Sequence, residues 1–294
     1  MTMRLARRRL GAILIGTLVG LATFQAPAFA ASFHPVPAAP AGGTIESKYA
    51  ANGPNAVSTQ RITDPASGGA FALYYPSNMG SAKLPIITWG NGTGGTPQTY
   101  DPLLRHIASW GYAVVASYSP NTGSGREILA GAKYMVAQNS AEGSPFNGKL
   151  DTANIGATGH SQGASGVVAA NKASGGLIKA TVPIGLPGFT TGTGVTGSIF
   201  YIGGTADTIC PPQGQLNAYA QTTVPAAVGS LVGATHFTEP IVTGGGGYQV
   251  AWMEWKLKGD SAAGAAFTGA TPELTHNPRW AQQATKNLGA ASAS

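Results

Sequence analysis

The sequence predicts an α/β protein with a mostly parallel central sheet and helices on both faces. Short runs rich in Val, Ile and Tyr alternate six times with segments whose apolar residues recur every three or four positions. Many of the short runs are bounded by Gly or Pro, as strands often are. The chain of 294 residues shows no internal repeat and no second domain.

Each element follows from its own pattern. Apolar runs predict strands at residues 71–75, 85–89, 112–117, 154–159, 181–186, 199–203 and 227–233. Helical spacing predicts helices at residues 99–109, 126–138, 161–173, 213–221 and 248–257. A sheet of this kind binds ligands at the carboxyl ends of its strands, so we expect the chemistry in loops just after strands.

The first 30 residues have the pattern of a secretory signal peptide. Four arginines lie among the first nine residues, an apolar run covers residues 10–24, and the small residues Ala28 and Ala30 follow. The run is shorter than the ~20 residues of a membrane-spanning helix, so we expect cleavage after Ala30 and no stable membrane insertion. The mature chain is then secreted, extracellular or periplasmic. Residues 31–57 are expected to be a flexible lead-in and 58–294 a single domain.

Charge and cysteine content exclude several kinds of function. Residues 1–30 hold four of the 17 basic residues and none of the 11 acidic ones, which leaves a net charge of +2. No basic cluster remains, so no nucleic-acid partner is expected. Cys210 is the only cysteine, so an internal disulfide and Cys-based zinc motifs are excluded. Without clustered carboxylates, we expect no metal or other cofactor, and we expect a monomer.

The pentapeptide GHSQG, residues 159–163, lies where a predicted strand ends and a predicted helix begins. In that context G-x-S-x-G is the nucleophile elbow of α/β-hydrolases. The tight turn strains the backbone of Ser161 and requires small residues two positions before and after it. The N–H of Gln162 then points to where an oxyanion would form, at the N-terminus of the helix. The alternative is an ordinary strand-to-helix turn with Ser161 as N-cap.

A serine nucleophile needs a base and an orienting acid, which in this fold follow it in the order acid, then histidine. His236 comes just after a predicted strand, whereas His276 lies in a polar tail. Asp207 is the only carboxylate between Ser161 and His236, and it also follows a predicted strand. It could instead cap its own loop as an Asx-turn. Glu239 is the alternative acid.

A second oxyanion donor is expected in the glycine-rich loop after the predicted strand at 85–89. This loop reads GNGTGG, residues 90–95. Glycine permits a close approach of backbone to a substrate carbonyl. The N–H of Asn91 is the first candidate and that of Gly92 the second, and Gly92 and Thr93 are expected to contact substrate. A phosphate-binding loop is excluded because the Lys-Ser/Thr pair is missing.

Five segments resemble the bacterial polyester hydrolases, or cutinase-like esterases, with the related dienelactone hydrolases and chlorophyllases. They read ITWGNGTGG…LLRHIASWGYAVVA, IGATGHSQGASG, IFYIGGTADTICPP, GATHFTEP and YQVAWMEWKLKGD. The resemblance extends from residue 60 to about residue 275, in matching order and spacing. It implies an α/β-hydrolase fold, with Ser161 as nucleophile, Asp207 as acid, His236 as base and the N–H of Gln162 as oxyanion donor.

The resemblance also implies the activity, which is ester cleavage through an acyl-enzyme. Its substrates would be polyesters, including aromatic ones such as poly(ethylene terephthalate). Phe189 falls near the position of a substrate-stacking tryptophan and is expected to line the site. The chain departs from the family pattern where it has Asn91 in place of an aromatic residue and Gln162 in place of methionine, and it cannot form the usual C-terminal disulfide.

The stretch between residues 186 and 198 is short and rich in Gly and Thr, so we expect no large lid. An open site admits a bulky ester or a polymer end. Two alternatives remain. One is a small-ester carboxylesterase or dienelactone-hydrolase-like enzyme, and the other is a non-catalytic secreted binding protein on the same scaffold.

Overall fold

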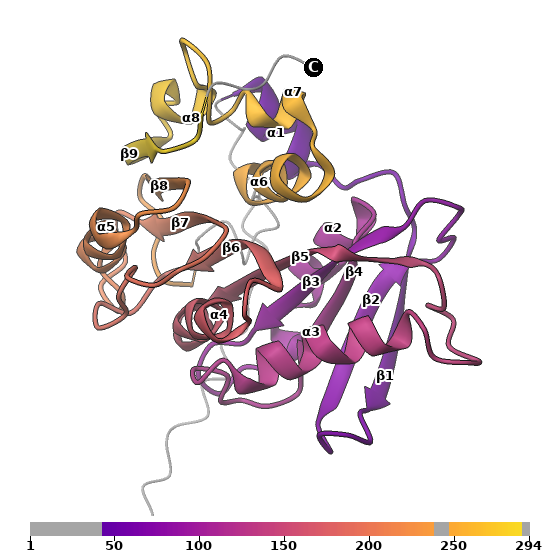
Figure 1. Ribbon diagram of the computed structural model, residues 1–294. Helices are drawn as coiled ribbons and strands as arrows, with labels where there is room; N and C mark the ends of the chain where they lie inside the picture. The colour runs from indigo at the N-terminus through magenta and orange to yellow at the C-terminus, as the bar shows by residue number, and fades with distance from the viewer. Residues whose placement is uncertain (1–42, 238–246, 290–294) are drawn as a thin grey trace, which may run out of the picture. The chain divides into compact units, whose positions relative to one another are not determined.

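The computed structural model describes residues 43–237 and 247–289. The predicted signal peptide, its cleavage after Ala30 and the first part of the predicted lead-in lie outside the described residues. Within them, nine strands form one sheet in the order β1-β2-β4-β3-β5-β6-β7-β8-β9 (Figure 1). The strands are β1 Val57–Thr63, β2 Ala70–Pro76, β3 Leu84–Gly90, β4 Ala113–Ser117, β5 Leu150–His160, β6 Ile178–Ile184, β7 Ser198–Gly204, β8 Ala226–Leu231 and β9 Trp280–Lys286.

The central part of the sheet is parallel. From β4 through β3, β5, β6 and β7 to β8, each strand pairs in parallel with the next. β1, β2 and β9 join the sheet in antiparallel pairs at its two sides. The mostly parallel sheet of an α/β-hydrolase is therefore confirmed.

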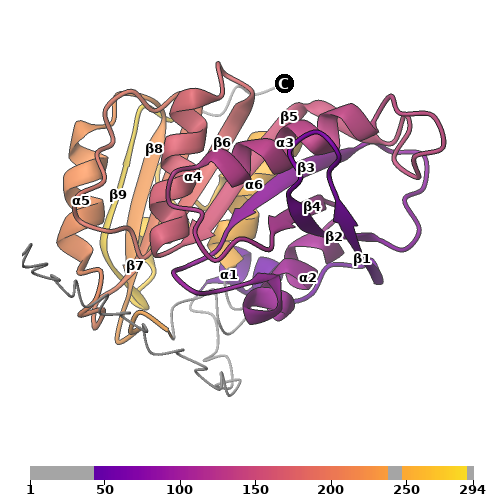
Figure 2. The ribbon, with the colours of Figure 1, turned by 90° about the horizontal axis from the view of Figure 1, so that it is seen from below.

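Helices cover both faces of this sheet (Figure 2). The helices are α1 Thr44–Ala50, the 3-10 helix η1 Pro97–Tyr100, α2 Asp101–Ser109, α3 Arg126–Gln138, α4 Gln162–Ala173, α5 Pro212–Gln221, α6 Gly247–Lys258, α7 Ser261–Gly264 and α8 Glu273–His276. Buried side chains of α3 and α4 pack with Ile86, and those of α2 and α6 pack with its neighbour Ile87, because successive residues of a strand face opposite sides. No helix in the described part of the chain is long and apolar enough to cross a membrane.

The predicted strands correspond to β2 through β8 and the predicted helices to α2 through α6. The largest shift is in β5, which begins at Leu150 where a start at residue 154 was expected. The sequence did not indicate β1, β9 or the short helices α1, α7 and α8. The two edge strands are partly exposed, so they lack the apolar runs that mark strands buried on both faces.

The predicted flexible lead-in at 31–57 is wrong for residues 44–50, which form α1. This helix packs against α6, and its Glu46 and Tyr49 are buried. A local run of Ala, Pro and Gly gives no sign of this order because the partners of Glu46 lie at the other end of the chain. Asn277, which donates a hydrogen bond to Glu46, is 231 positions away.

A polar network joins α1 to the C-terminal part of the chain. Glu273, at the start of α8, accepts hydrogen bonds from two N–H groups in the first turn of α1 at 2.8 and 2.9 Å, and from the hydroxyl of Tyr248 at 3.0 Å. Such N–H groups have no partner within their own helix. Asn277 and Trp280 donate to the buried carboxylate of Glu46 at 2.7 and 2.9 Å. Removing the acceptor at Glu273 therefore leaves several donors unsatisfied.

We expect Glu273→Gln to lower the free energy of unfolding by about 1–3 kcal/mol, because an amide NH2 would face donors that now meet a carboxylate. Urea denaturation measures the change. Glu142→Gln, which alters an exposed glutamate, is the matched control and should shift stability by less than about 0.5 kcal/mol. Equal stabilities of the two variants would contradict a stabilising role for the network.

Candidate active site

Ser161 lies in a tight turn between the end of β5 and the start of α4. Its backbone angles, φ 55° and ψ −123°, are rare for a residue with a side chain. The N–H of Ser161 donates to the carbonyl of Ile184 at 2.9 Å, which attaches the turn to the end of β6. The GHSQG motif thus adopts the strained strand-to-helix geometry that its sequence predicts.

Two glycines allow this turn to approach the end of β3. A Cβ on Gly163 would lie 2.1 Å from the carbonyl oxygen of Gly90, and one on Gly159 would lie 2.6 Å from the carbonyl oxygen of Gly163. Both obstacles are backbone atoms, which cannot move aside as the end of a flexible side chain can. Hydrogen is therefore the only side chain that fits at either position without displacing the turn.

The structure brings Ser161, His236 and Asp207 together, although 75 positions separate the first two. His236 Nε2 lies 2.9 Å from Ser161 Oγ, and its Nδ1 lies 2.7 Å from Asp207 Oδ2. Asp207 Oδ1 accepts hydrogen bonds from the N–H groups of Ile209 and Cys210 at 2.8 and 2.7 Å. The carboxylate is thus also the Asx-type cap of its loop. Since a carboxylate only accepts, Nδ1 carries the imidazole proton and Nε2 faces the hydroxyl as an acceptor.

Hydrogen bonds between the loops after β7 and β8 hold Asp207 beside His236. The N–H of Ala206 donates to the carbonyl of Ala234 at 2.9 Å, and the N–H of Gly233 donates to the hydroxyl of Thr205 at 2.8 Å. Both side chains are almost fully buried, with exposures of 3% for Asp207 and 4% for His236.

The sequence also contains another histidine, His276, and an alternative acid, Glu239. His276 is exposed on α8, where its Nδ1 lies 2.9 Å from the carbonyl of Pro272, and the structure does not place it with Ser161. Glu239, the alternative acid, lies outside the described residues.

The side chain of Asn91 and the N–H of Gly92, the second predicted oxyanion donor, are hydrogen-bonded to other parts of the protein. Asn91 is fully buried, and its amide donates to the carbonyls of Ser117 and Ser119 at 2.6 and 3.0 Å. The side chain of Asn91 therefore attaches the glycine-rich loop to the end of β4 and does not face solvent. The N–H of Gly92 donates to the hydroxyl of Tyr100 at 3.0 Å. The next residue, Thr93, is exposed, and no hydrogen bond to its N–H is found among the described residues.

Gln162 connects three parts of this edge of the sheet. Its side-chain oxygen accepts from the N–H groups of Thr122 and Gly123 at 2.9 and 3.1 Å, and its side-chain nitrogen donates to the hydroxyl of Thr93 at 3.2 Å. Its own backbone N–H is at the start of α4, where such groups have no partner within the helix. The residue after Ser161 thus fixes the glycine-rich loop relative to the loop after β4.

The chain is similar to known proteins over most of its length. A family model described as PET hydrolase-like matches residues 31–277. The chain belongs to the PET hydrolase-like family. A bis(hydroxyethyl) terephthalate hydrolase of Streptomyces coelicolor is 25% identical to it over 280 residues, which cover 88% of this chain and 86% of that relative. Membership of the family confirms the enzyme class that the sequence implies, a carboxylic ester hydrolase.

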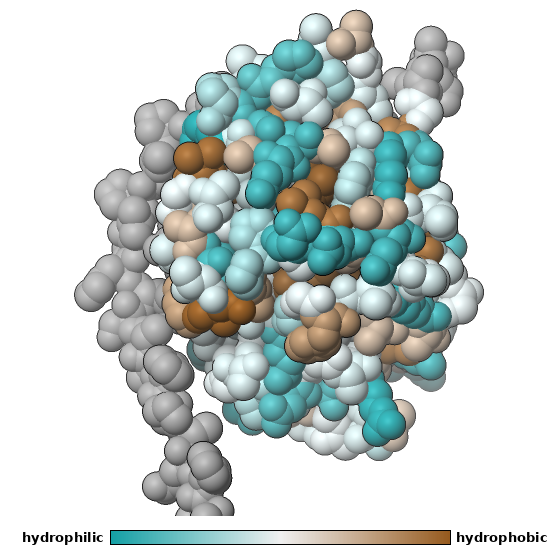
Figure 3. Space-filling view, turned by 90° about the vertical axis from the view of Figure 1, so that its left-hand side faces the viewer, coloured by the Kyte–Doolittle hydropathy of each residue, from teal (hydrophilic) through white to brown (hydrophobic). Residues whose placement is uncertain are grey.

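In this PET hydrolase-like chain, each of the loops after β6, β7 and β8 carries at least one exposed large apolar side chain. Phe189, predicted from the sequence, is 82% exposed after β6. Ile209 and Phe237, 58% and 40% exposed, were missed, although they stand two positions after Asp207 and directly after His236. Adjacency to the two predicted polar residues was the signal that could have found them. On the face that carries α5, apolar patches are small and separated by polar side chains (Figure 3).

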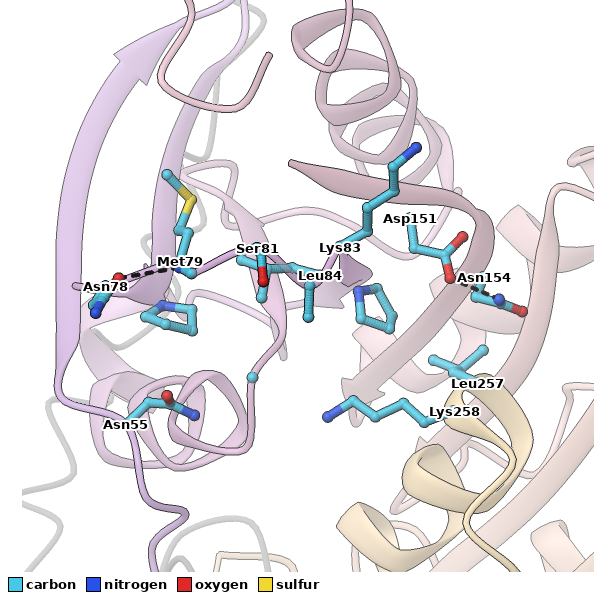
Figure 4. Close-up of a pocket in the computed structure, with 15 residues that line it drawn as sticks. Asn55, Asn78, Met79, Ser81, Lys83, Leu84, Asp151, Asn154, Leu257 and Lys258 are labelled. Carbon is cyan, nitrogen blue, oxygen red and sulfur yellow. Dashed lines mark hydrogen bonds between the residues drawn. The ribbon is translucent and has the colours of Figure 1, made fainter. Parts of the chain in front are cut away.

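Neither of two cavities formed by described residues, of about 620 and 480 Å³, is lined by Ser161, Asp207 or His236. One of about 620 Å³ lies at the amino ends of β3 and β5, opposite the end of β5 that leads to Ser161. Figure 4 shows Lys258 reaching from the end of α6 toward Asn55 across it, with Asp151 bonded to Asn154 at its side. Because the chemistry-bearing side chains and the exposed apolar ones gather at the carboxyl edge, we place the site there. Among the described residues, no group of His, Cys, Asp and Glu is arranged to hold a metal ion.

We expect Gly163→Ala to destabilise the protein by about 1–3 kcal/mol or more, because the added methyl group would collide with the carbonyl of Gly90. Esterase activity should fall with it, since the turn at Ser161 must shift. Thermal melting and hydrolysis of a nitrophenyl ester measure the two effects. Gly188→Ala is the control, because the nearest atom to its new Cβ lies 3.9 Å away. A Gly163→Ala protein as stable and active as this control would contradict the packing argument.

Proposed function

We propose that this chain is a secreted serine ester hydrolase that cleaves terephthalate-type esters through an acyl-enzyme. In this proposal Ser161 is the nucleophile, His236 the general base and Asp207 the acid that orients it. One observation carries the proposal. The imidazole of His236 lies between the hydroxyl and the carboxylate, 2.9 Å from one and 2.7 Å from the other. These distances lie within reach for proton transfer without movement of the chain.

Acylation begins when Ser161 Oγ attacks the ester carbonyl carbon. As the new carbon–oxygen bond forms, the hydroxyl proton passes to His236 Nε2 and the carbonyl electron pair moves to its oxygen. The positive imidazole is stabilised by the carboxylate of Asp207. When the tetrahedral intermediate collapses, the alcohol leaves and takes the proton from Nε2. A water molecule then repeats the sequence on the acyl-enzyme and releases the acid.

The negative oxygen of the intermediate needs two N–H donors in place before the reaction. We propose the N–H of Gln162 as the first, at the start of the twelve-residue helix α4. For the second we propose the N–H of Thr93 in place of Asn91. The complete burial of Asn91 and the bond from Gly92 to Tyr100 support this change, as does the exposure of Thr93.

The substrate proposal rests on the apolar surface beside Ser161. Phe189, Ile209 and Phe237 supply exposed rings and an aliphatic side chain, which suit the flat aromatic ring of a terephthalate unit. The loop between β6 and β7 supports the absence of a large lid. It is held down by the bond between the hydroxyls of Ser165 and Thr190 at 2.6 Å.

A second candidate is an esterase that acts on small soluble esters and not on polymer. The similarity to a bis(hydroxyethyl) terephthalate hydrolase favours it, since the substrate in the name of that relative is a small diester. In both cases the proposed reaction uses only side chains and backbone N–H groups of this chain, the ester and water. The pattern of residues 1–30 supports export, and we propose that the enzyme works as a monomer outside the cytoplasm without a nucleic-acid partner.

We expect Ser161→Ala to lower kcat for a short-chain nitrophenyl ester by roughly 10⁴-fold or more, because no other group can form the acyl-enzyme. Release of nitrophenol measures the rate. Ser140→Ala, at an exposed position after α3, is the matched control and should keep full activity. If Ser161→Ala remained active, or if a fluorophosphonate labelled both variants alike, the acyl-enzyme mechanism would be wrong.

The aromatic surface should matter more for polymer than for a small ester. We expect Phe189→Ala and Phe237→Ala each to lower product release from a poly(ethylene terephthalate) film by about fivefold, the equivalent of an aromatic contact of ~1 kcal/mol. Hydrolysis of nitrophenyl acetate should change less than twofold. Soluble products from the film are measured chromatographically beside the hydrolysis of bis(hydroxyethyl) terephthalate. Wild-type enzyme that cleaves the diester and leaves the film intact would decide for the second candidate.

A further inference from the structure

We propose that Tyr100 and His160 form an uncharged hydrogen-bond chain that positions His236 at one end and the glycine-rich loop at the other. The proposal rests on the proposed function, because it gives both residues a task in the reaction of Ser161. Neither residue touches the reacting atoms, so both are positioning residues.

Three hydrogen bonds make up the chain. The N–H of Gly92 donates to the hydroxyl oxygen of Tyr100 at 3.0 Å. That hydroxyl lies 3.0 Å from Nδ1 of His160, and Nε2 of His160 lies 3.0 Å from the backbone carbonyl oxygen of His236. These hydrogen bonds therefore connect the loop after β3 to the loop after β8 through His160, the residue directly before Ser161.

The chemistry of the end groups fixes the direction of every bond. A backbone carbonyl only accepts, so Nε2 of His160 must carry a proton and donate to His236. In a neutral imidazole the other nitrogen then accepts, so the hydroxyl of Tyr100 donates to Nδ1. The oxygen of Tyr100 remains free to accept from the N–H of Gly92. All donors and acceptors along the chain are satisfied in one arrangement.

The surroundings keep both side chains uncharged. His160 is 3% and Tyr100 6% exposed. Burial, together with the nearby ring of His236, lowers the pKa of His160 to about 3, while the more distant carboxylate of Asp207 acts in the opposite sense. Burial raises the pKa of Tyr100 to about 12. At any pH between these two pKa values, His160 and Tyr100 both stay uncharged, as the three hydrogen bonds require.

An uncharged His160 matters because its ring centroid lies 4.5 Å from that of His236. His236 becomes positive when it takes the proton of Ser161, and a second positive charge at this distance in a buried site would oppose that transfer. The bond to the backbone of His236 also holds the base near Ser161. At the other end, a Cβ on Gly92 would lie 3.4 Å from Cβ of Ser161, so the chain fixes the loop where the substrate carbonyl must bind.

Tyr100→Phe tests the chain, because it removes one hydroxyl and keeps the ring that packs on Trp89. We expect kcat for a nitrophenyl ester to fall about tenfold with KM changed less than twofold, since a positioning defect raises the barrier without removing a substrate contact. Tyr201→Phe is the matched control. It removes a buried hydroxyl bonded to Thr222 at 2.7 Å, and it should lose similar stability while keeping its kcat. An unchanged kcat in Tyr100→Phe would overturn the proposal.

Nitrogen-15 NMR of labelled histidine gives a readout that does not depend on activity or on a variant that folds poorly. We expect His160 to show a protonated Nε2 and an unprotonated Nδ1 that do not titrate between about pH 5 and 9. The opposite tautomer, or titration in that range, would overturn the chain. Failure of the proposed function is distinct from these outcomes, because it would appear as undiminished hydrolysis by Ser161→Ala.

Discussion

The close backbone contact between the end of β3 and the start of α4 is the constraint on which the site depends. Gly163 lies against the carbonyl of Gly90 with no room for a side chain, and this approach lets the chain turn sharply at Ser161. The strain at φ 55° persists because both sides of the turn are fixed, by β6 on one side and by the helix on the other. A wider turn would lower the hydroxyl into the sheet and separate it from His236.

The remaining groups reach Ser161 because parallel strands end at one edge. β7 and β8 are neighbours in this part of the sheet, so the loops that follow them run side by side and bond to each other through Ala206 and Ala234. Asp207 and His236 stand on these two loops. Although Asp207 and His236 are 29 positions apart in the sequence, Oδ2 of the first therefore lies 2.7 Å from Nδ1 of the second.

Much of this arrangement could be predicted from local sequence, and the reason is physical. Strands buried on both faces must be apolar, and a turn as tight as the one at Ser161 needs glycines beside it, so β2 through β8 and this turn left clear patterns in the sequence. α1 left no such pattern, because the hydrogen-bond partners of its buried Glu46 are Asn277 and Trp280, near the other end of the chain. Nothing in the sequence indicated the hydrogen bond between Tyr100 and His160 either. Each is an ordinary residue in its own segment, and only the fold brings them into contact.

Asn91 shows what sequence position alone leaves undecided. A polar residue directly after a buried strand can turn its side-chain amide toward substrate or toward the loop that supports it, and both choices satisfy the same pattern. Here the side chain of Asn91 donates hydrogen bonds to the carbonyls of Ser117 and Ser119, which holds the loop in place. The cost of an unsatisfied buried carbonyl favours this choice. Thr93, two positions later, is exposed to solvent. A rigid loop in turn suits an oxyanion site, because donors already held in place need no reorganisation as charge develops.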